Sequence, residues 1–153
     1  YRLISDLEKE GINVTIGVGS IAESLYDLSL SYKKSWKAIR IGRKVKKGTE
    51  VFNVRDYKLE ELISDINKAN YRQFVFEVLH KLQQQSDWPE YRKTIILWCE
   101  SNFVVSQASK LLHVHRNTLS YRLNKIYEIS GLDLRKYKDA MMLYLAVLLL
   151  DLA

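Results

Sequence analysis

The feature that most constrains the fold is a pair of short apolar periodicities separated by a turn of a few residues. At about 100° per residue, each stretch gathers its apolar side chains on one side of a helix. These residues are Ala108, Leu111 and Leu112 in the stretch 106–114, and Leu119, Leu123 and Ile126 in the stretch 115–126. The other side of the second stretch is polar. The pattern predicts a helix-turn-helix, a motif whose second helix can enter the DNA major groove.

Several positions of the turn have the residue types that the motif needs. Ser109 is a small residue where the two helices must cross closely. His113 stands where the chain usually turns through a left-handed conformation, which favours glycine but tolerates His at a modest cost. Val114 and Leu119 have the spacing of a hydrophobic staple, which makes His115 the predicted N-cap of the second helix.

The string HRNTLSYRLNKIYEISGLDL, within residues 103–134, resembles the C-terminal helix-turn-helix of the CdaR/PucR-type bacterial regulators, named for sugar-diacid and purine catabolism. The likeness continues to about Leu152. In that family the C-terminal domain binds DNA, and an upstream sensory region responds to a small molecule. The resemblance therefore implies a transcription regulator of a catabolic operon, with a recognition helix at about 115–130 and its effector bound upstream of this fragment.

The expected partner of this motif is double-stranded DNA. The predicted contact residues are polar or basic: Gln107, Lys110, His115, Arg116, Asn117, Thr118, Ser120, Tyr121, Arg122 and Lys125. Arg116, Asn117 and Tyr121 are expected near base edges, because the first turns of a recognition helix enter the groove. The other cations of this set are expected to contact phosphates, and the two hydroxyl residues Thr118 and Ser120 to donate to the DNA backbone.

Composition is compatible with this prediction. The chain has 153 residues, of which 47% are hydrophobic and 27% charged, as in ordinary globular proteins. A net charge of +6 suits a polyanionic partner. The single cysteine, Cys99, lies in an apolar stretch and is expected to be a buried, unreactive thiol of a reducing compartment.

The ends of the sequence give further expectations. A first residue Tyr and the lack of a secretion signal predict a fragment of a longer cytoplasmic protein. The longest apolar run, Ala140 to Leu150, has 11 residues. A membrane-spanning helix needs about 20. This run therefore predicts a helix buried on all sides, either in this fold or against another chain.

The N-terminal third reads as alternating helices and strands. Helices are predicted at 1–10 and 21–41, and strands at 13–17 and 50–54. The expected core stripe of the second helix is Leu25, Leu28, Tyr32, Trp36 and Ile39. Two strands alone do not make a stable sheet, so the rest of the sheet is expected upstream or from a partner. The IGVGS string and the pair Ser31-Tyr32 resemble the last part of a GGDEF-like domain, although no GG[DE]F sequence is present.

From Leu59 onward the pattern is helical, with apolar stripes over 59–66 and 74–82 and a polar run at 83–86. The predicted fold class is α+β, mainly α. It combines a partial GGDEF-like α/β segment at 1–57, connecting helices at 58–86 and an all-helical helix-turn-helix domain at 87–153. A homodimer is expected, because a single small reading head binds weakly and the terminal helix is apolar.

Other candidate sites lack the partners that their chemistry needs. Gly17, Gly19 and Ala22 match G-x-G-x-x-A, but no Asp or Glu occurs from Leu28 to Thr49, where a dinucleotide site needs one. Glycines that let a strand turn tightly into a helix are the preferred explanation. No nucleophile elbow or compact set of metal ligands occurs, so we expect neither an enzyme nor a metal or cofactor site.

Two questions stay open at the level of sequence. The acid-free interval contains eight cations between Lys33 and Lys47. They could contact the DNA backbone, meet an acidic partner domain, or form the solvated face of a helix. The alternative function is a signalling or scaffold module without DNA binding, in which the helical corner binds protein and a degenerate GGDEF-like part senses a nucleotide.

Overall fold

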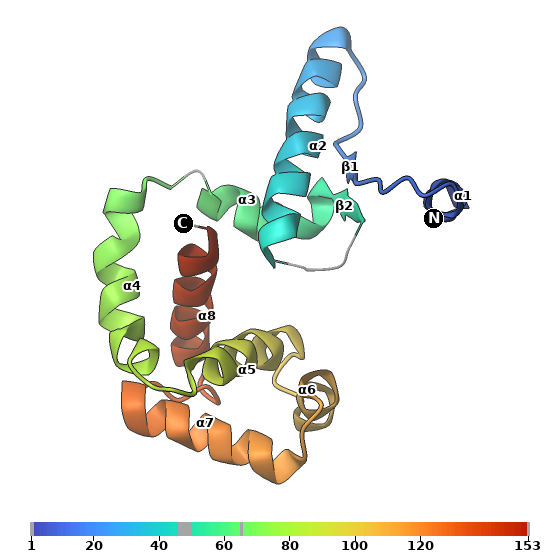
Figure 1. Ribbon diagram of the computed structural model, residues 1–153. Helices are drawn as coiled ribbons and strands as arrows, with labels where there is room; N and C mark the ends of the chain where they lie inside the picture. Colours follow the sequence, from blue (N-terminus) through green and yellow to red (C-terminus); the bar gives the residue numbers. More distant parts are fainter. Residues whose placement is uncertain (1, 46–49, 65, 153) are drawn as a thin grey trace. The chain divides into compact units, whose positions relative to one another are not determined.

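The computed structural model of the chain describes residues 2–45, 50–64 and 66–152 (Figure 1). It contains, in chain order, α1 (Arg2–Lys9), β1 (Ile16–Val18), α2 (Leu25–Val45), β2 (Val51–Asn53), the 3-10 helix η1 (Val54–Tyr57), α3 (Lys58–Ser64), α4 (Lys68–Gln83), α5 (Trp88–Glu100), α6 (Val105–Leu112), α7 (Arg116–Ser130) and α8 (Tyr137–Leu152). The mainly helical class is confirmed.

The chain forms two compact units. Residues 1–65 together with Leu152 make up the first unit, and residues 66–151 make up the second. The predicted connecting segment 58–86 is thus divided, because α3 lies in the first unit and α4 in the second. Each unit has its own core.

The first unit is built on a parallel pair of strands joined by α2. The register pairs Ile16 with Val51, Gly17 with Phe52 and Val18 with Asn53. A parallel pair needs a crossover connection, and α2 supplies it. The core of this unit is a small cluster from α2, β2 and η1: Ala38, Ile41, Phe52, Val54 and Tyr57.

Three glycines allow α2 to pack closely on the strands. A Cβ atom at Gly17 would lie 2.4 Å from the Ser35 carbonyl oxygen, and one at Gly19 would lie 2.3 Å from that of Ser31. A Cβ atom at Gly42 would lie 2.0 Å from the Phe52 ring. None of the three has a positive φ. The G-x-G pair therefore serves close helix packing, and the expected reason, a tight turn from strand to helix, is wrong.

The predicted core stripe of α2 is wrong except at Ile39, which is partly buried against the core of this unit. Four of its five residues are exposed, at 87% for Leu25, 58% for Leu28, 64% for Tyr32 and 59% for Trp36. The helix begins four residues later than predicted, and the face that packs on the strands carries Ala38, Ile41 and Gly42 instead. Ala38 and Gly42 on the packed face let the helix approach the strands closely, and the four exposed apolar residues lie outside that face.

The apolar stripe predicted over 59–66 behaves in the same way. Ile63 is buried, whereas Leu59, Leu62 and Ile66 are exposed. A helix break separates α3 from α4, and Asn67 caps α4 by accepting a hydrogen bond from the Ala69 amide. The stripe is therefore not the face of one continuous helix.

The second unit contains α4 to α8 around a larger core. The stripe predicted over 74–82 is confirmed, since Leu79 and Leu82 of α4 are buried. Tyr91, Ile95 and Trp98 of α5 are also buried. Pro89 lies in the first turn of α5, where the backbone N–H groups have no intrahelical partner. Asp87 takes the N-cap position there, but its side chain makes no capping hydrogen bond.

The apolar helix α8 belongs to this core. Its buried residues are Ala140, Leu143, Ala146, Val147, Leu148 and Leu149. Trp98 on α5 donates its indole N–H to the Leu134 carbonyl oxygen at 2.8 Å, just before α8. Near the other end of α8, Arg92 forms a two-point ion pair with Asp151. No helix among the described residues is long and apolar enough to cross a membrane.

Candidate nucleic-acid interface

The turn between α6 and α7 is held by backbone hydrogen bonds. His113 adopts the left-handed conformation, with φ 55° and ψ 42°, as predicted. Its amide donates to the Lys110 carbonyl at 3.2 Å, and the Val114 amide donates to the Ser109 carbonyl at 3.0 Å. This pair of bonds is the Schellman motif, which satisfies the last carbonyls of a helix. The turn therefore has a defined geometry although it contains no glycine.

Close packing at the turn depends on small residues of α6. Ala108 is fully buried, and the buried hydroxyl oxygen of Ser109 has no hydrogen-bond partner among the described residues. Ser109 is thus present for its size, as the sequence predicted. The helices α5, α6 and α7 contact one another around this point (Figure 1).

His115 is the N-cap of α7, as predicted. Its Nδ1 atom accepts a hydrogen bond from the Asn117 amide at 3.3 Å. With Nδ1 as acceptor, the neutral imidazole carries its proton on Nε2. The cap thereby leaves one N–H donor at the exposed start of α7. At the other end, Gly131 stops the helix with φ 77°, and its amide donates to the Tyr127 carbonyl at 2.8 Å.

The two faces of α7 differ sharply. Leu119, Leu123 and Ile126 are buried, with 0 to 3% of each residue exposed. Eight of the ten predicted contact residues are exposed on α6, the turn or α7: Gln107, Lys110, His115, Arg116, Asn117, Thr118, Ser120 and Tyr121. Among the described residues, no carboxylate pairs with Lys110 or Arg116. We call this exposed set the reading face.

The other two predicted contacts are engaged within the protein. Arg122 forms an ion pair with Glu90 on α5 at 2.6 Å, and only 17% of its side chain is exposed. Lys125 donates to Glu128 at 2.6 Å, and this hydrogen bond raises the pKa of Lys125. Its ammonium also lies 5.9 Å from the centre of the Tyr121 ring. The sequence could not reveal the Arg122 pair, because Glu90 lies 32 positions away on another helix.

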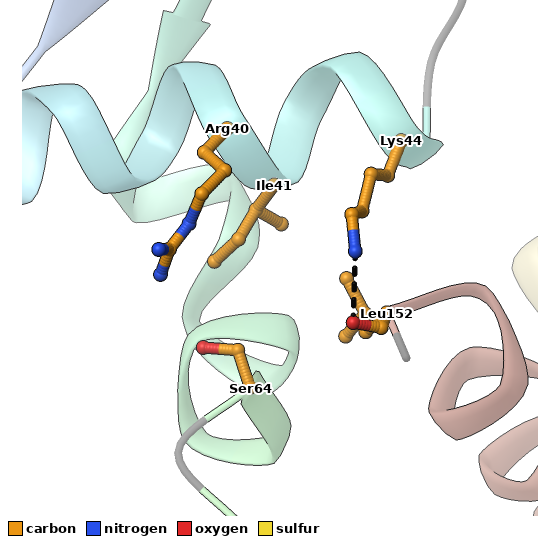
Figure 2. A pocket seen from close by; sticks show the side chains of 5 residues that line it. All are labelled: Arg40, Ile41, Lys44, Ser64 and Leu152. Atoms are coloured by element: carbon orange, nitrogen blue, oxygen red, sulfur yellow. Dashed lines mark hydrogen bonds between the residues drawn. The ribbon is translucent and has the colours of Figure 1, made fainter.

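The cations of α2 line shallow surfaces of the first unit. Arg40, Ile41, Lys44 and Ser64 border a hollow of about 210 Å³, together with Leu152 (Figure 2). Arg43 donates to the Thr15 hydroxyl at 2.9 Å, and Lys37 lies 4.0 Å from Glu61. The predicted cations at 46 and 47 lie outside the described residues. The stretch thus combines exposed and paired cations, and no observation identifies its ligand.

No group of three or more His, Cys, Asp and Glu side chains that could hold a metal ion occurs within residues 2–45, 50–64 and 66–152. Cys99 is half-buried, and its thiol donates to the Ala140 carbonyl at 3.8 Å. Burial raises the pKa of this thiol to about 12. A thiol with such a pKa is neutral at physiological pH and is a poor nucleophile.

Comparisons with known proteins agree with this geometry. Residues 91–149 match the PucR C-terminal helix-turn-helix domain, a match that covers α6, α7 and most of α5 and α8. The chain is 30% identical over 147 residues to the carbohydrate diacid regulator of Escherichia coli, an alignment that covers 95% of this chain and 38% of the relative.

Two relatives from Bacillus subtilis are similar to the chain over much of its length. The purine catabolism regulatory protein is 26% identical over 137 residues, covering 88% of this chain and 25% of the relative. The DNA-binding transcriptional activator AdeR is 28% identical over 142 residues, covering 88% and 33%. The chain therefore spans between 25% and 38% of the length of these three relatives. The helix-turn-helix geometry and the family match together show that residues 91–149 form a helix-turn-helix domain of the PucR C-terminal family.

Proposed function

We propose that this chain is the DNA-binding part of a transcription regulator of a catabolic operon, and that it binds by placing α7 in the major groove. The observation that carries the proposal is the reading face. An exposed polar and basic surface lies opposite a buried apolar stripe on a helix whose start is fixed by a Schellman turn and a cap. Such a helix can enter the groove without exposing its core.

We assign roles by position along α7. Arg116, Asn117 and Tyr121 contact base edges, because they lie in the first turns and are exposed. Arginine pairs with guanine and asparagine with adenine in the bidentate geometry of the major groove. Thr118 and Ser120 donate to the DNA backbone, and the remaining exposed members of the reading face contact phosphates.

Arg122 takes a different role from the one that its charge alone suggests. Its ion pair with Glu90 joins α7 to α5. We therefore propose that it positions the recognition helix and does not contact phosphate. Lys125, held by Glu128 beside Tyr121, orients that ring.

The test measures binding of this chain to duplex DNA by fluorescence anisotropy across a salt series. Fragments of regulatory regions and a random duplex of equal length are compared. We expect Arg116→Ala and Asn117→Ala to weaken selective binding by about 1 to 3 kcal/mol each, the value of one bidentate base contact. Arg55→Ala is the control, because it removes an exposed positive charge of the first unit and leaves the reading face intact. Absence of binding to any duplex at low salt would contradict the proposal and favour a protein-docking role for the corner.

We also propose that the regulator binds as a homodimer in the cytoplasm and is not an enzyme. A dimer would present two copies of α7 to half-sites about one helical turn, or a multiple of it, apart. The burial of α8 within its own unit removes the terminal helix as an argument for dimerisation, so the proposal rests on half-site geometry. Light scattering of the chain with and without its operator tests it, and a single copy on a palindromic operator would contradict it.

The first unit is proposed to be the end of a GGDEF-like domain, with the effector bound by a region upstream. The parallel order β1, α2, β2 and the close glycine packing support this proposal. Limited proteolysis and effector titration of a chain extended to the length of its relatives would test it. An effector that binds the present chain directly would contradict the upstream location.

A further inference from the structure

The connection from α7 to α8 and the first turn of α8 carry a cluster of cations that is absent from the predicted contact residues. Arg135, Lys136 and Lys138 occur within four positions, and all three are exposed. The side chain of Arg135 is 46% exposed. A run of this kind is ordinarily a solvated surface, so its meaning depends on what the structure places beside it.

The structure places Arg135 at the side of the recognition helix. Its guanidinium donates to the side-chain oxygen of Asn124. Asn124 is exposed and lies seven residues after Asn117, which is two turns further along the same side of α7. Arg135 thus adjoins the reading face at its C-terminal half, although it comes from a different element.

The loop that carries Arg135 is held in one conformation. Leu134 is fully buried, and its carbonyl accepts the Trp98 indole N–H at 2.8 Å. Asp133 accepts a hydrogen bond from the Arg135 amide at 3.1 Å, and Asp139 accepts one from the Asp133 amide at 3.0 Å. The two carboxylates near the cluster are therefore engaged with the backbone of the loop.

Donors remain on Arg135 after these contacts. The guanidinium has five N–H groups. It donates one hydrogen bond to Asn124 and one, at 3.5 Å, to Asp133. Among the described residues, no carboxylate pairs with Lys136 or Lys138. Arg135 thus offers a pre-oriented guanidinium beside α7, and the exposed ammonium groups of Lys136 and Lys138 follow it within three positions.

We propose that Arg135, Lys136 and Lys138 form a second DNA-contact site that binds phosphates flanking the base pairs read by the start of α7. The inference rests on the proposed function. A recognition helix enters the groove with its first turns, and its C-terminal end passes close to the DNA backbone, where phosphate contacts fix its register. Asn124 orients Arg135 toward that backbone.

The experiment measures the salt dependence of duplex binding for the complete chain, for Arg135→Ala and for the double variant Lys136→Ala, Lys138→Ala. The slope of log affinity against log salt is expected to fall by about 0.9 for each phosphate that the variant no longer neutralises. Affinity for specific and random duplexes should fall by the same factor, because phosphates carry no sequence information. Arg55→Ala removes the same charge in the first unit and should leave the slope unchanged.

Asn124→Gln provides a variant that keeps the net charge. It should lower affinity through the misplaced Arg135, and this effect should vanish in the Arg135→Ala background. Thermal unfolding of every variant checks that the fold is retained.

The outcomes separate the two proposals. One outcome would overturn the second site alone. In it, Arg116→Ala weakens selective binding, whereas Arg135→Ala and the double lysine variant leave both the affinity and the salt slope unchanged. A chain that binds no duplex at low salt would overturn both. A fall in slope for the loop variants, without a fall for Arg55→Ala, would establish the second site.

Discussion

The helices α2 and α7 carry similar apolar stripes in the sequence and use them in opposite ways. In α7 the stripe is buried, because α4, α5 and α6 all contact this helix. In α2 most of the stripe is exposed, because the strands, η1 and α3 contact a different face, which carries Ala38, Ile41 and Gly42. Periodicity therefore identifies a helix and an apolar face, but burial of that face depends on which elements surround the helix.

The largest expected difference between the two units is in the reactivity of a thiol placed in each. Cys99 in the second unit has a pKa of about 12 against an ordinary 9.0, because burial disfavours the thiolate. A cysteine introduced by Leu25→Cys would stand on the exposed stripe of α2. At pH 8, the thiolate fraction of the new thiol should be about a thousandfold larger, a factor of ten for each pKa unit, so we expect it to react much faster with a thiol-specific reagent.

The same pKa gives a sign for stability. The folded protein holds the Cys99 proton more tightly than the unfolded chain does. Its contribution to stability is therefore intact below pH 9 and declines as pH rises from 9 toward 12.

The reactivity prediction is tested by stopped-flow labelling in native buffer and in urea, which measures the reaction rates of Cys99 and of the introduced thiol. Reaction of native Cys99 within tenfold of the new thiol would show that α5 and α8 separate readily.

Core truncation should separate the two stripes next. Leu119 is fully buried on α7, and Leu119→Ala is expected to lower the free energy of unfolding by about 2 to 5 kcal/mol. The matched variant on α2, Leu28→Ala, should change it by less than about 0.5 kcal/mol, because that side chain is exposed. Urea denaturation followed by circular dichroism gives both values. Equal decreases would mean that the stripe of α2 is covered in solution.

These contrasts explain which features the sequence could predict. The helix-turn-helix was predictable in detail, including the left-handed His113 and the His115 cap, because turn and cap signals act between residues a few positions apart. The packed face of α2 was not, because its small residues are selected by contact with strands rather than by helical period. The Arg122 pair with Glu90 and the Arg135 contact with Asn124 join separate elements, which no local pattern encodes.

Replacement of Gly42 in the first unit should change the free energy of unfolding by a smaller amount, and the sign of that change tests how closely α2 packs. In an exposed helix interior, replacement of Gly by Ala stabilises by about 1 kcal/mol. At Gly42, however, the new methyl group would meet the buried Phe52 ring at 2.0 Å. Gly42→Ala should therefore lower the free energy of unfolding by about 1 to 3 kcal/mol, as overpacking does. Thermal denaturation of Gly42→Ala measures this change, with Ser29→Ala at an exposed position of the same helix as the control. Stabilisation by both variants would contradict close packing of α2.

The smallest effects concern the two left-handed residues that follow α1 and α6. Gly11 has φ 73° in the first unit, and a Cβ atom there would meet nothing within 4 Å. His113 has φ 55° in the second unit. The left-handed conformation costs a residue with a side chain about 1 to 2 kcal/mol, part of which is offset because such a residue loses less entropy on folding than glycine.

Gly11→Ala should therefore destabilise by about 1 kcal/mol and His113→Gly should stabilise by about 0.5 kcal/mol. Melting temperatures of the two variants, measured with the parent chain, give the signs. If His113→Gly destabilises instead, the imidazole makes a contribution to the turn that outweighs the strain of its backbone. The DNA affinity of His113→Gly distinguishes the contribution of the backbone conformation from that of the imidazole. An unchanged Kd with a raised melting temperature would show that the turn needs the left-handed backbone and not the His113 imidazole.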